Sequence, residues 1–385
     1  MLQRTIDLPK KKSFFLFGPR QVGKSTILKN WFNSANTFFY NLLDSDLYFQ
    51  MVATPSLLSE ELKKLDKKFT HIVIDEIQRV PDLLNEVHQN IEENKNRVFI
   101  LSGSSARKLK RSGANMLGGR ALTYELFPFT HKELKEQFSL DRVLRFGTLP
   151  SVYLDEDQYA KETLKSYVRT YLEQEIKAEA QVRNLRAFVK FLDLAGSENG
   201  QITNYSNIAN DTQCDYKTVQ EYYQILEDTL IGFNLHPYSG SFRKQIRKHP
   251  KFYFFDTGVQ RAISKKLDSE LIPKTRDYGA TFEHFFILEM IRIASYTRKD
   301  FSFSYYQTKS GAEVDLIVEK YDGKCFAIEI KASDRVEVKK LTGLKSFQEV
   351  RKDAHLLCAS LCKRTEGNQD ITIAPWKAVI EEVIG

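Results

Sequence analysis

Alternating apolar and polar segments at the start of the chain predict an α/β domain. Short apolar runs stand at Phe14–Phe17, His71–Asp75 and Arg97–Ser102, each of a length that suits one buried strand. Helical patterns of apolar and polar residues separate these runs. Because strands that alternate with helices form parallel sheets, we expect a parallel sheet within this part of the chain.

The pattern changes twice further along the chain. From about Tyr159 to Glu227 it is helical, and after Gly232 it becomes aromatic and rich in strand-forming residues. The last third has an apolar helix near Phe282–Ala294. Three predicted strands follow it, at Phe301–Tyr306, Glu313–Lys320 and Cys325–Ala332. These changes predict three domains, over residues 1–150, 151–250 and 251–385.

A glycine-rich loop follows the first apolar run. The segment from Gly18 to Ser25 reads G-x-x-x-x-G-K-S, in which glycines let backbone N–H groups turn towards phosphate oxygens. Lys24 is placed to reach the β- and γ-phosphates of ATP, and Ser25 to bind Mg²⁺. The helix that begins here adds its positive end. We expect the nucleotide to contact Gly18, Pro19, Arg20, Gln21, Val22, Gly23, Lys24, Ser25 and Thr26.

Two carboxylates end the second apolar run. We expect Asp75 to hold the Mg²⁺ shell and Glu76 to polarise the attacking water as a general base. The alternative is a strand that ends in a solvated acidic turn. The adjacent glutamate favours ATP hydrolysis over passive nucleotide binding.

Further polar residues follow the third apolar run. Ser102 is a candidate sensor of the γ-phosphate, and the alternative is an ordinary polar loop. Arg107 and Arg120 are candidates for stabilising charge in the transition state, in cis or from a neighbouring subunit. Either arginine can equally be a surface residue.

A second group of charged residues lies in the last third of the chain. Asp315 stands on one predicted strand and Glu329 and Lys331 on the next, with an Asp-Gly turn signal between the strands. Because side chains alternate along a strand, Glu329 and Lys331 share a face, and the hairpin can bring Asp315 beside Glu329. Two carboxylates that hold Mg²⁺, with a lysine that orients or deprotonates water, suit phosphodiester hydrolysis. Glu283, on the apolar helix, is a further metal ligand or else the partner of Lys331 in a salt bridge.

The middle region predicts a helix-turn-helix. Residues 203–226 read as two short helices joined by a turn, and Tyr216 and Lys217 open the second helix, where a DNA reader makes contacts. The segment 232–255 has five Lys or Arg and no acid, so it can form a basic wing. Its basic residues, which suit phosphates, are Arg243, Lys244, Arg247, Lys248 and Lys251. The alternatives are a helical module for protein contacts and a solvated basic loop.

Composition and charge exclude several classes of protein. Hydrophobic residues make up 42% and charged residues 28%, a globular balance that excludes a disordered or collagen-like chain. The longest apolar stretch, Phe285–Ala294, is interrupted by Glu289 and Arg292, and the start of the chain lacks the apolar core of a signal peptide. A net charge of +7 is compatible with nucleic acid without requiring it. We expect a cytoplasmic protein with no membrane partner.

The motifs, taken in order, resemble one family. They are GPRQVGKST, IVIDEIQRVPDLL, ILSGSSARKL, LGGRALTYELFPFT, the LPS at Leu149–Ser151, HPKFYFFDTGV, and TKSGAEVDLIVE with IEIKAS. Together they are similar to prokaryotic ATP-binding proteins that pair an AAA-like P-loop ATPase domain with a C-terminal DUF4143 region. The resemblance covers about residues 10–335. It implies an AAA+-like core of the ASCE type, a winged helix-turn-helix, and a C-terminal α/β domain similar to PD-(D/E)xK, restriction-endonuclease-like nucleases.

The resemblance also assigns residues. It implies a nucleotide site at Lys24, Ser25, Asp75 and Glu76, and a nuclease-like site at Glu283, Asp315, Glu329 and Lys331. Arg120 falls in the family's G-R motif and is therefore the preferred arginine finger. Gln307 stands where the family has arginine in the strand before the acidic motif, which puts in doubt a charge at the rim of the second site.

Three functions stay open. The leading hypothesis is an ATP-hydrolysing, DNA-associated protein with a C-terminal Mg²⁺-dependent nuclease, in which the nucleotide state gates DNA engagement. The second is a homo-oligomeric motor, for instance a hexamer, that translocates or branch-migrates DNA and has a non-catalytic nuclease-like domain. The third is a regulatory ATPase switch that binds protein partners.

Overall fold

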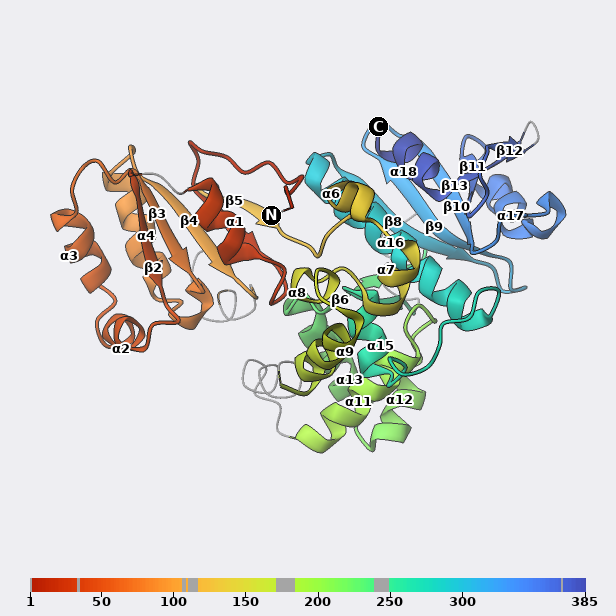
Figure 1. Cartoon of the computed structure of the whole chain (residues 1–385), viewed down its shortest axis with the longest axis horizontal. Helices are drawn as coiled ribbons and strands as arrows, with labels where there is room; N and C mark the ends of the chain where they lie inside the picture. Colours follow the sequence, from red (N-terminus) through yellow and green to blue (C-terminus); the bar gives the residue numbers. More distant parts are fainter. Residues whose placement is uncertain are drawn as a thin grey trace. The chain divides into compact units, whose positions relative to one another are not determined.

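The computed structural model describes residues 2–32, 35–105, 109, 117–170, 184–238, 249–367 and 370–385. The chain divides into two compact units, shown in Figure 1: residues 1–129 with Ile225–Ile231, and Thr130–Gln224 with Gly232–Gly385. Within the described ranges, no helix has the length and apolar character needed to cross a bilayer.

The first unit is built on a parallel five-stranded sheet. Its strands lie in the order β2-β3-β4-β1-β5, and every pair in it is parallel. Their bounds are β1 Phe14–Phe17, β2 Thr37–Asn41, β3 His71–Asp75, β4 Val98–Gly103 and β5 Leu122–Glu125. The predicted α/β class with a parallel sheet is confirmed. The sequence pattern did not predict β2 and β5, because they form the edges of the sheet and each buries only one tyrosine, Tyr40 or Tyr124.

Helices follow the strands of this sheet in the chain. They are α1 Lys24–Trp31, α2 Ser45–Ala53, α3 Leu57–Lys64, the 3-10 helix η1 Ile77–Arg79 and α4 Leu83–Glu93. The apolar faces of α2, α3 and α4 pack with the central strands in one core that includes Phe15, Ile72 and Val87. This packing fixes the carboxyl ends of β1, β3 and β4, where the predicted nucleotide residues stand.

The second unit begins with helices. Their bounds are α6 His131–Leu134, η2 Lys135–Gln137, α7 Leu140–Phe146, α8 Pro150–Tyr153, α9 Asp157–Ser166, α11 Leu185–Ser197, α12 Tyr205–Thr212 and α13 Tyr216–Asp228, whose last residues, from Ile225 on, belong to the first unit. The two predicted helices of the middle region are present as α12 and α13. Two antiparallel strands follow, β6 Gly232–Leu235 and β7 Lys251–Phe254, and then the short helix α15 Thr257–Ile263.

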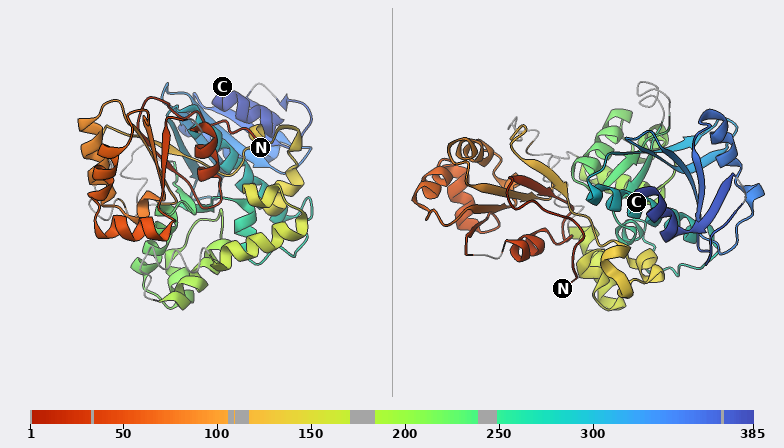
Figure 2. Two further views of the ribbon diagram at one scale, coloured as in Figure 1. Left: turned by 60° about the vertical axis from the view of Figure 1, so that its left-hand side comes forward. Right: turned by 90° about the horizontal axis from the view of Figure 1, so that it is seen from above.

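A six-stranded mixed sheet completes the second unit. Its order is β12-β13-β11-β10-β9-β8, with β8, β9 and β10 antiparallel and β10, β11 and β13 parallel. The bounds are α16 Arg276–Thr297, β8 Phe301–Gln307, β9 Glu313–Lys320, β10 Cys325–Lys331, η4 Val338–Lys340, α17 Thr342–Val350, β11 His355–Ser360, β12 Glu366–Gly367, β13 Ile371–Pro375 and α18 Trp376–Ile384. The C-terminal helix α18 packs against β11 and β13 (Figure 1 and Figure 2).

Candidate nucleotide site and carboxylate cluster

The glycine-rich loop lies between β1 and α1, the context that its pattern predicts. Its backbone is left-handed at Gln21 and Gly23, with φ of 64° and 94°. At Gly18 a Cβ atom would lie 2.3 Å from the backbone oxygen of Leu126, so this position has room only for glycine. Arg4 donates hydrogen bonds to the backbone oxygens of Val22 and Phe127 and so braces the loop from the N-terminal segment.

The remaining residues of the predicted loop differ in exposure. Pro19 and Val22 are buried, Arg20 is half-buried, and Thr26 is exposed. Arg4, which braces this loop, was missed by the sequence analysis, because nothing local in the sequence marks an arginine eighteen residues before its partner.

Lys24 lies inside this loop. Its Nζ atom donates hydrogen bonds to the backbone oxygens of Gly18, at 2.8 Å, and Pro19, at 3.0 Å, and only 6% of the residue is exposed. Burial lowers the pKa of Lys24 to about 8, against the charges of Glu76 and Asp75, which raise it. The hydrogen-bond partners of the ammonium group are neutral backbone oxygens, which phosphate oxygens can replace.

The Asp75 carboxylate, at the end of β3, accepts hydrogen bonds from two serine hydroxyl groups. Ser25 Oγ donates to Asp75 Oδ2 at 2.6 Å, and Ser102 Oγ donates to Asp75 Oδ1. Ser102 lies on β4, which stands between β1 and β3 in the sheet, and it therefore reaches the same carboxylate from a neighbouring strand. A carboxylate beside a serine hydroxyl is the donor set that Mg²⁺ prefers, so Ser25 and Asp75 fit the predicted ion.

Glu76 is held in an unusual conformation. Its φ of 63° and ψ of 43° are left-handed, which is uncommon for a residue other than glycine. Gln78 Nε2 donates to Glu76 Oε2 at 2.5 Å and to Ser104 Oγ at 3.0 Å. A Cβ atom at Gly103 would lie 2.5 Å from Gln78 Oε1, so the glycine gives this amide its space. The sequence analysis missed Gln78, although it stands only two residues after Glu76.

The predicted arginines are placed differently. Arg120 forms an ion pair with Glu92 of α4 and donates to the backbone oxygen of Gly118 at 3.2 Å. Its side chain is 39% exposed, so within this chain it lies on the surface of the first unit. Arg107 lies outside the described residues.

The second predicted site forms a larger cluster than expected. Pairing of Ile328 with Leu316 sets Glu329 opposite Asp315, as the predicted hairpin requires. The register between β8 and β9 shifts beside Asp315, and such irregularities often redirect a side chain near a site. The members of the cluster are Lys251 and Tyr253 from β7, Glu283 from α16, Glu313 and Asp315 from β9, and Glu329 and Lys331 from β10.

Lysines partner the carboxylates of this cluster. Lys331 Nζ lies 2.5 Å from Glu329 Oε2 and 3.8 Å from Asp315 Oδ2, and Asp315 Oδ2 also accepts the backbone N–H of Ile330 at 2.7 Å. Lys251 Nζ donates to Glu313 and lies 3.7 Å from Glu283. The salt-bridge partner of Glu283 is thus Lys251 and not Lys331, the partner that the sequence analysis named.

Burial shapes the charges of the cluster. Burial raises the pKa of Glu283 and of Glu329. The charge of Asp315 raises both pKa values further, whereas a neighbouring lysine, Lys251 for Glu283 and Lys331 for Glu329, lowers them. Burial also lowers the pKa of Lys251, but the charges of the surrounding carboxylates raise it by more. Tyr253 donates its hydroxyl to Glu283 at 2.7 Å.

The cluster offers suitable donor atoms for a metal ion but not a suitable arrangement of them. Carboxylate oxygens are suitable donors for Mg²⁺, but across the described ranges no three His, Cys, Asp or Glu side chains are arranged to hold a metal ion. Gln307, at the position where the resemblance leads us to expect arginine, donates to Glu313 Oε2 at 3.2 Å. The rim therefore carries a neutral amide in place of a positive charge.

The predicted DNA-contacting residues are only partly described. Tyr216 and Lys217 stand exposed at the start of α13, as expected. Arg243, Lys244, Arg247 and Lys248 lie outside the described residues. The interpretation of Lys251 as a phosphate contact on a basic loop is wrong, because its side chain is buried among the carboxylates.

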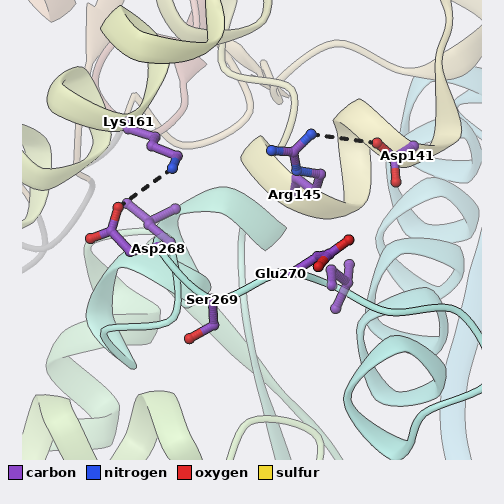
Figure 3. A pocket seen from close by; sticks show the side chains of 8 residues that line it. Asp141, Arg145, Lys161, Asp268, Ser269 and Glu270 are labelled. Carbon is purple, nitrogen blue, oxygen red and sulfur yellow. Dashed lines mark hydrogen bonds and ion pairs between the residues drawn. The ribbon is translucent and has the colours of Figure 1, made fainter.

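A separate pocket lies between α7, α9 and the segment 267–271 (Figure 3). It has a volume of about 300 Å³ and is lined mainly by charged residues. Lys161 pairs with Asp268 at 3.5 Å and Arg145 with Asp141 at 3.7 Å, so these charges are satisfied within the pocket wall. This arrangement points to no particular ligand.

Three family models match successive parts of the chain. An AAA domain matches residues 10–135, and DUF4143, a domain of unknown function, matches residues 278–379. The chain thus joins an AAA-type domain to a C-terminal DUF4143 domain. At this level the predicted resemblance is confirmed, and the AAA domain supports the predicted nucleotide-binding ATPase. Between them, residues 137–270 match DUF8612, a second domain of unknown function.

Relatives that match most of this chain come from bacteria and archaea. An uncharacterized protein of Mycobacterium tuberculosis is 26% identical over 82% of this chain and 69% of its own length. One from Methanocaldococcus jannaschii is 24% identical over 98% of this chain and 86% of its own. Among solved structures, domain III of the Thermotoga maritima replication initiation protein DnaA aligns with 57% of this chain and 85% of its own, with 12% identity and a TM-score of 0.23.

Proposed function

We propose that the first unit hydrolyses ATP with Mg²⁺. The observation that carries this proposal is the group formed by Ser25, Asp75 and Ser102 at the ends of neighbouring strands, beside a phosphate loop that contains Lys24. The match of residues 10–135 to an AAA domain supports it. Bound Mg²⁺ would be held by Ser25 and Asp75 and would neutralise charge on the phosphates.

Each residue then has a distinct role. Lys24 exchanges the carbonyls of Gly18 and Pro19 for phosphate oxygens. Glu76 orients the attacking water and accepts its proton, with its carboxylate positioned by Gln78. Ser102 senses the γ-phosphate through Asp75. Arg120 acts as an arginine finger in trans, which requires a homo-oligomer such as a hexamer.

Two substitutions test this proposal. Lys24→Ala should abolish both binding of a fluorescent ATP analogue and phosphate release. Glu76→Gln should retain binding and lose turnover. Wild-type turnover in both variants, in preparations shown to be free of a contaminating ATPase, would contradict it.

A second candidate function is DNA binding with Mg²⁺-dependent cleavage in the second unit. The juxtaposition of Asp315, Glu329 and Lys331 favours it, together with a mixed sheet preceded by the helix that carries Glu283. We propose that α12 and α13 with the β6–β7 ribbon form a winged helix that contacts DNA through Tyr216 and Lys217. Nucleotide state at the first site would gate this engagement.

Incubation of plasmid and branched DNA with Mg²⁺, with and without ATP, tests the second candidate. Nicking that is lost in Asp315→Ala would support it, and Glu76→Gln would then show whether ATP turnover gates cleavage. DNA-stimulated ATPase activity without nicking would favour a DNA motor with a non-catalytic C-terminal domain. DNA affinity that does not depend on salt, or none at all, would favour a switch that binds protein partners.

A further inference from the structure

We propose that Lys251 is a built-in counter-ion of the carboxylate cluster, and that its ammonium group keeps a divalent cation out from between Glu283 and Glu313. The inference deepens the second candidate function, because it concerns the access of metal to that site. It also adds Glu313 to the ligands that a metal ion would use. Neither Lys251 nor Glu313 stood in the predicted metal set.

The position of Lys251 carries this inference. Its side chain is 5% exposed, and its Nζ atom lies within ion-pair distance of both Glu283 and Glu313. The same Nζ lies 5.3 Å from the centre of the Tyr305 ring, which closes another side of the group. A buried ammonium between two carboxylates supplies the positive charge that a metal ion would otherwise supply.

The second lysine of the cluster is placed differently. Lys331 pairs with Glu329 and Asp315, but its side chain is 40% exposed. An exposed lysine can swing into solvent at little cost, whereas Lys251 would need the movement of its strand. Lys251 is therefore the residue that decides whether a metal ion can enter.

The strand β7 links this lysine to the rest of the second unit. Lys251 is the first residue of β7, where it pairs with Leu235 of β6, and it also bridges to Ile202. Tyr253, two residues further on, donates to Glu283. One strand thus inserts two side chains among the carboxylates, and a shift of β7 would withdraw both together.

Titration with Mn²⁺ tests this inference by binding alone. The parent is the full-length chain with Asp75→Ala, so that the nucleotide site adds no metal binding. We expect no site-specific Mn²⁺ binding in this parent. Adding Lys251→Met should create one site per chain, with an affinity for Mn²⁺ at least about 100-fold above any residual binding by the parent, because charges about 4 Å apart interact strongly even at an effective dielectric constant of about 20. Lys251→Arg, the matched control, should stay like the parent.

Further arms separate the outcomes. Adding Asp315→Asn should abolish the new Mn²⁺ site, which places it in the cluster. Because Lys251→Met leaves buried carboxylates unpaired and can prevent folding, Lys251→Gln, whose neutral amide can still donate to Glu313, provides a second variant with the same expected gain, checked by circular dichroism. Two results would overturn the inference. One is a Mn²⁺ site in the parent that disappears with Asp315→Asn, and it counts whether or not either variant folds. The other is a folded Lys251→Met protein that binds no Mn²⁺.

The same variants distinguish this inference from the proposed nuclease. Mn²⁺ binding by Lys251→Met without any nicking of DNA would support the counter-ion and contradict the nuclease. Nicking by the wild type that depends on Asp315, together with Mn²⁺ binding in the parent, would support the nuclease and overturn the counter-ion.

Discussion

The nucleotide site and the carboxylate cluster are built from the same kinds of side chain, but these are paired in opposite ways. At the first site Asp75 accepts hydrogen bonds from serine hydroxyls, and Lys24 donates to backbone carbonyls. In the cluster the carboxylates are paired with the ammonium groups of Lys251 and Lys331. Neutral partners are exchanged readily for a ligand, whereas separating buried opposite charges is costly. The first site is therefore prepared for a charged ligand, and the second supplies its own cations.

Loss of the proposed general base should have the largest effect. Glu76→Gln should lower the ATP hydrolysis rate by about 10²–10⁴-fold, because the amide cannot accept the proton of water, while ATP binding is retained. Phosphate release and binding of a fluorescent ATP analogue measure the two properties. The exposed Glu60→Gln on α3 is a matched control that should behave as the wild type. Equal rates for Glu76→Gln and Glu60→Gln would remove Glu76 from the mechanism.

Replacing each buried lysine by methionine tests the difference in pairing directly. Lys251→Met should lower the free energy of unfolding of the second unit by about 3–5 kcal/mol, because two carboxylates lose a buried partner. Lys24→Met should change the stability of the first unit by about 1 kcal/mol or less, since its partners are neutral oxygens and burial disfavours its charge.

The two tryptophans allow each unit to be followed separately. Trp31 ends α1 in the first unit and Trp376 begins α18 in the second. Denaturant titrations by fluorescence, in Trp31→Phe and Trp376→Phe backgrounds, therefore report one unit each. Equal losses for the two lysine substitutions would contradict the comparison.

Gln78 should influence turnover more than binding. Gln78→Ala frees the Glu76 carboxylate from its amide partner and should lower the hydrolysis rate by about 10–100-fold, with little change in ATP affinity. Gln89→Ala, on the surface of α4, is the matched control. A change in affinity alone, at an unchanged maximal rate, would show that Gln78 does not position the base.

ATP affinity should fall as the pH rises past about 8, the pKa of Lys24 in the nucleotide-free protein. The folded pKa is below the usual value for lysine, so between pH 8 and the usual value the folded state holds fewer protons than the unfolded chain. The folded state thus gains stability with rising pH while it loses the charge that attracts phosphate. Affinity at pH 9 should be about tenfold weaker than at pH 7, measured by calorimetry. An affinity that stays constant to pH 9 would contradict the role of the Lys24 charge.

Local patterns predicted the elements and motifs whose signal lies within a few residues. The strand Glu313–Lys320 has the bounds that the sequence predicts, and the Asp-Gly turn correctly sets Asp315 opposite Glu329. The edge strands β2 and β5 were missed, and each of them buries only one side chain, Tyr40 or Tyr124. The parallel order of the sheet followed from the alternation of strands and helices, but the place of β4 between β1 and β3 did not.

The full set of residues in the second site could not be predicted from local patterns. Lys251 of β7 reaches Glu313 of β9 across 62 residues of sequence, and no local spacing encodes that contact. Its basic surroundings in the sequence suggested a basic wing or, as the alternative, a solvated loop. Glu313 was overlooked because an acidic residue at the start of a strand is ordinary until a lysine is buried against it.

Calorimetric titration of the wild-type chain tests the central comparison most directly. The account predicts one Mg²⁺-dependent binding event for a non-hydrolysable ATP analogue, abolished by Lys24→Ala, and no binding of Mn²⁺ to the carboxylate cluster. A Mn²⁺ event that survives Lys24→Ala and Asp75→Ala, and disappears with Asp315→Ala, would show that the second site takes a metal ion as readily as the first takes a nucleotide. That result would contradict the account.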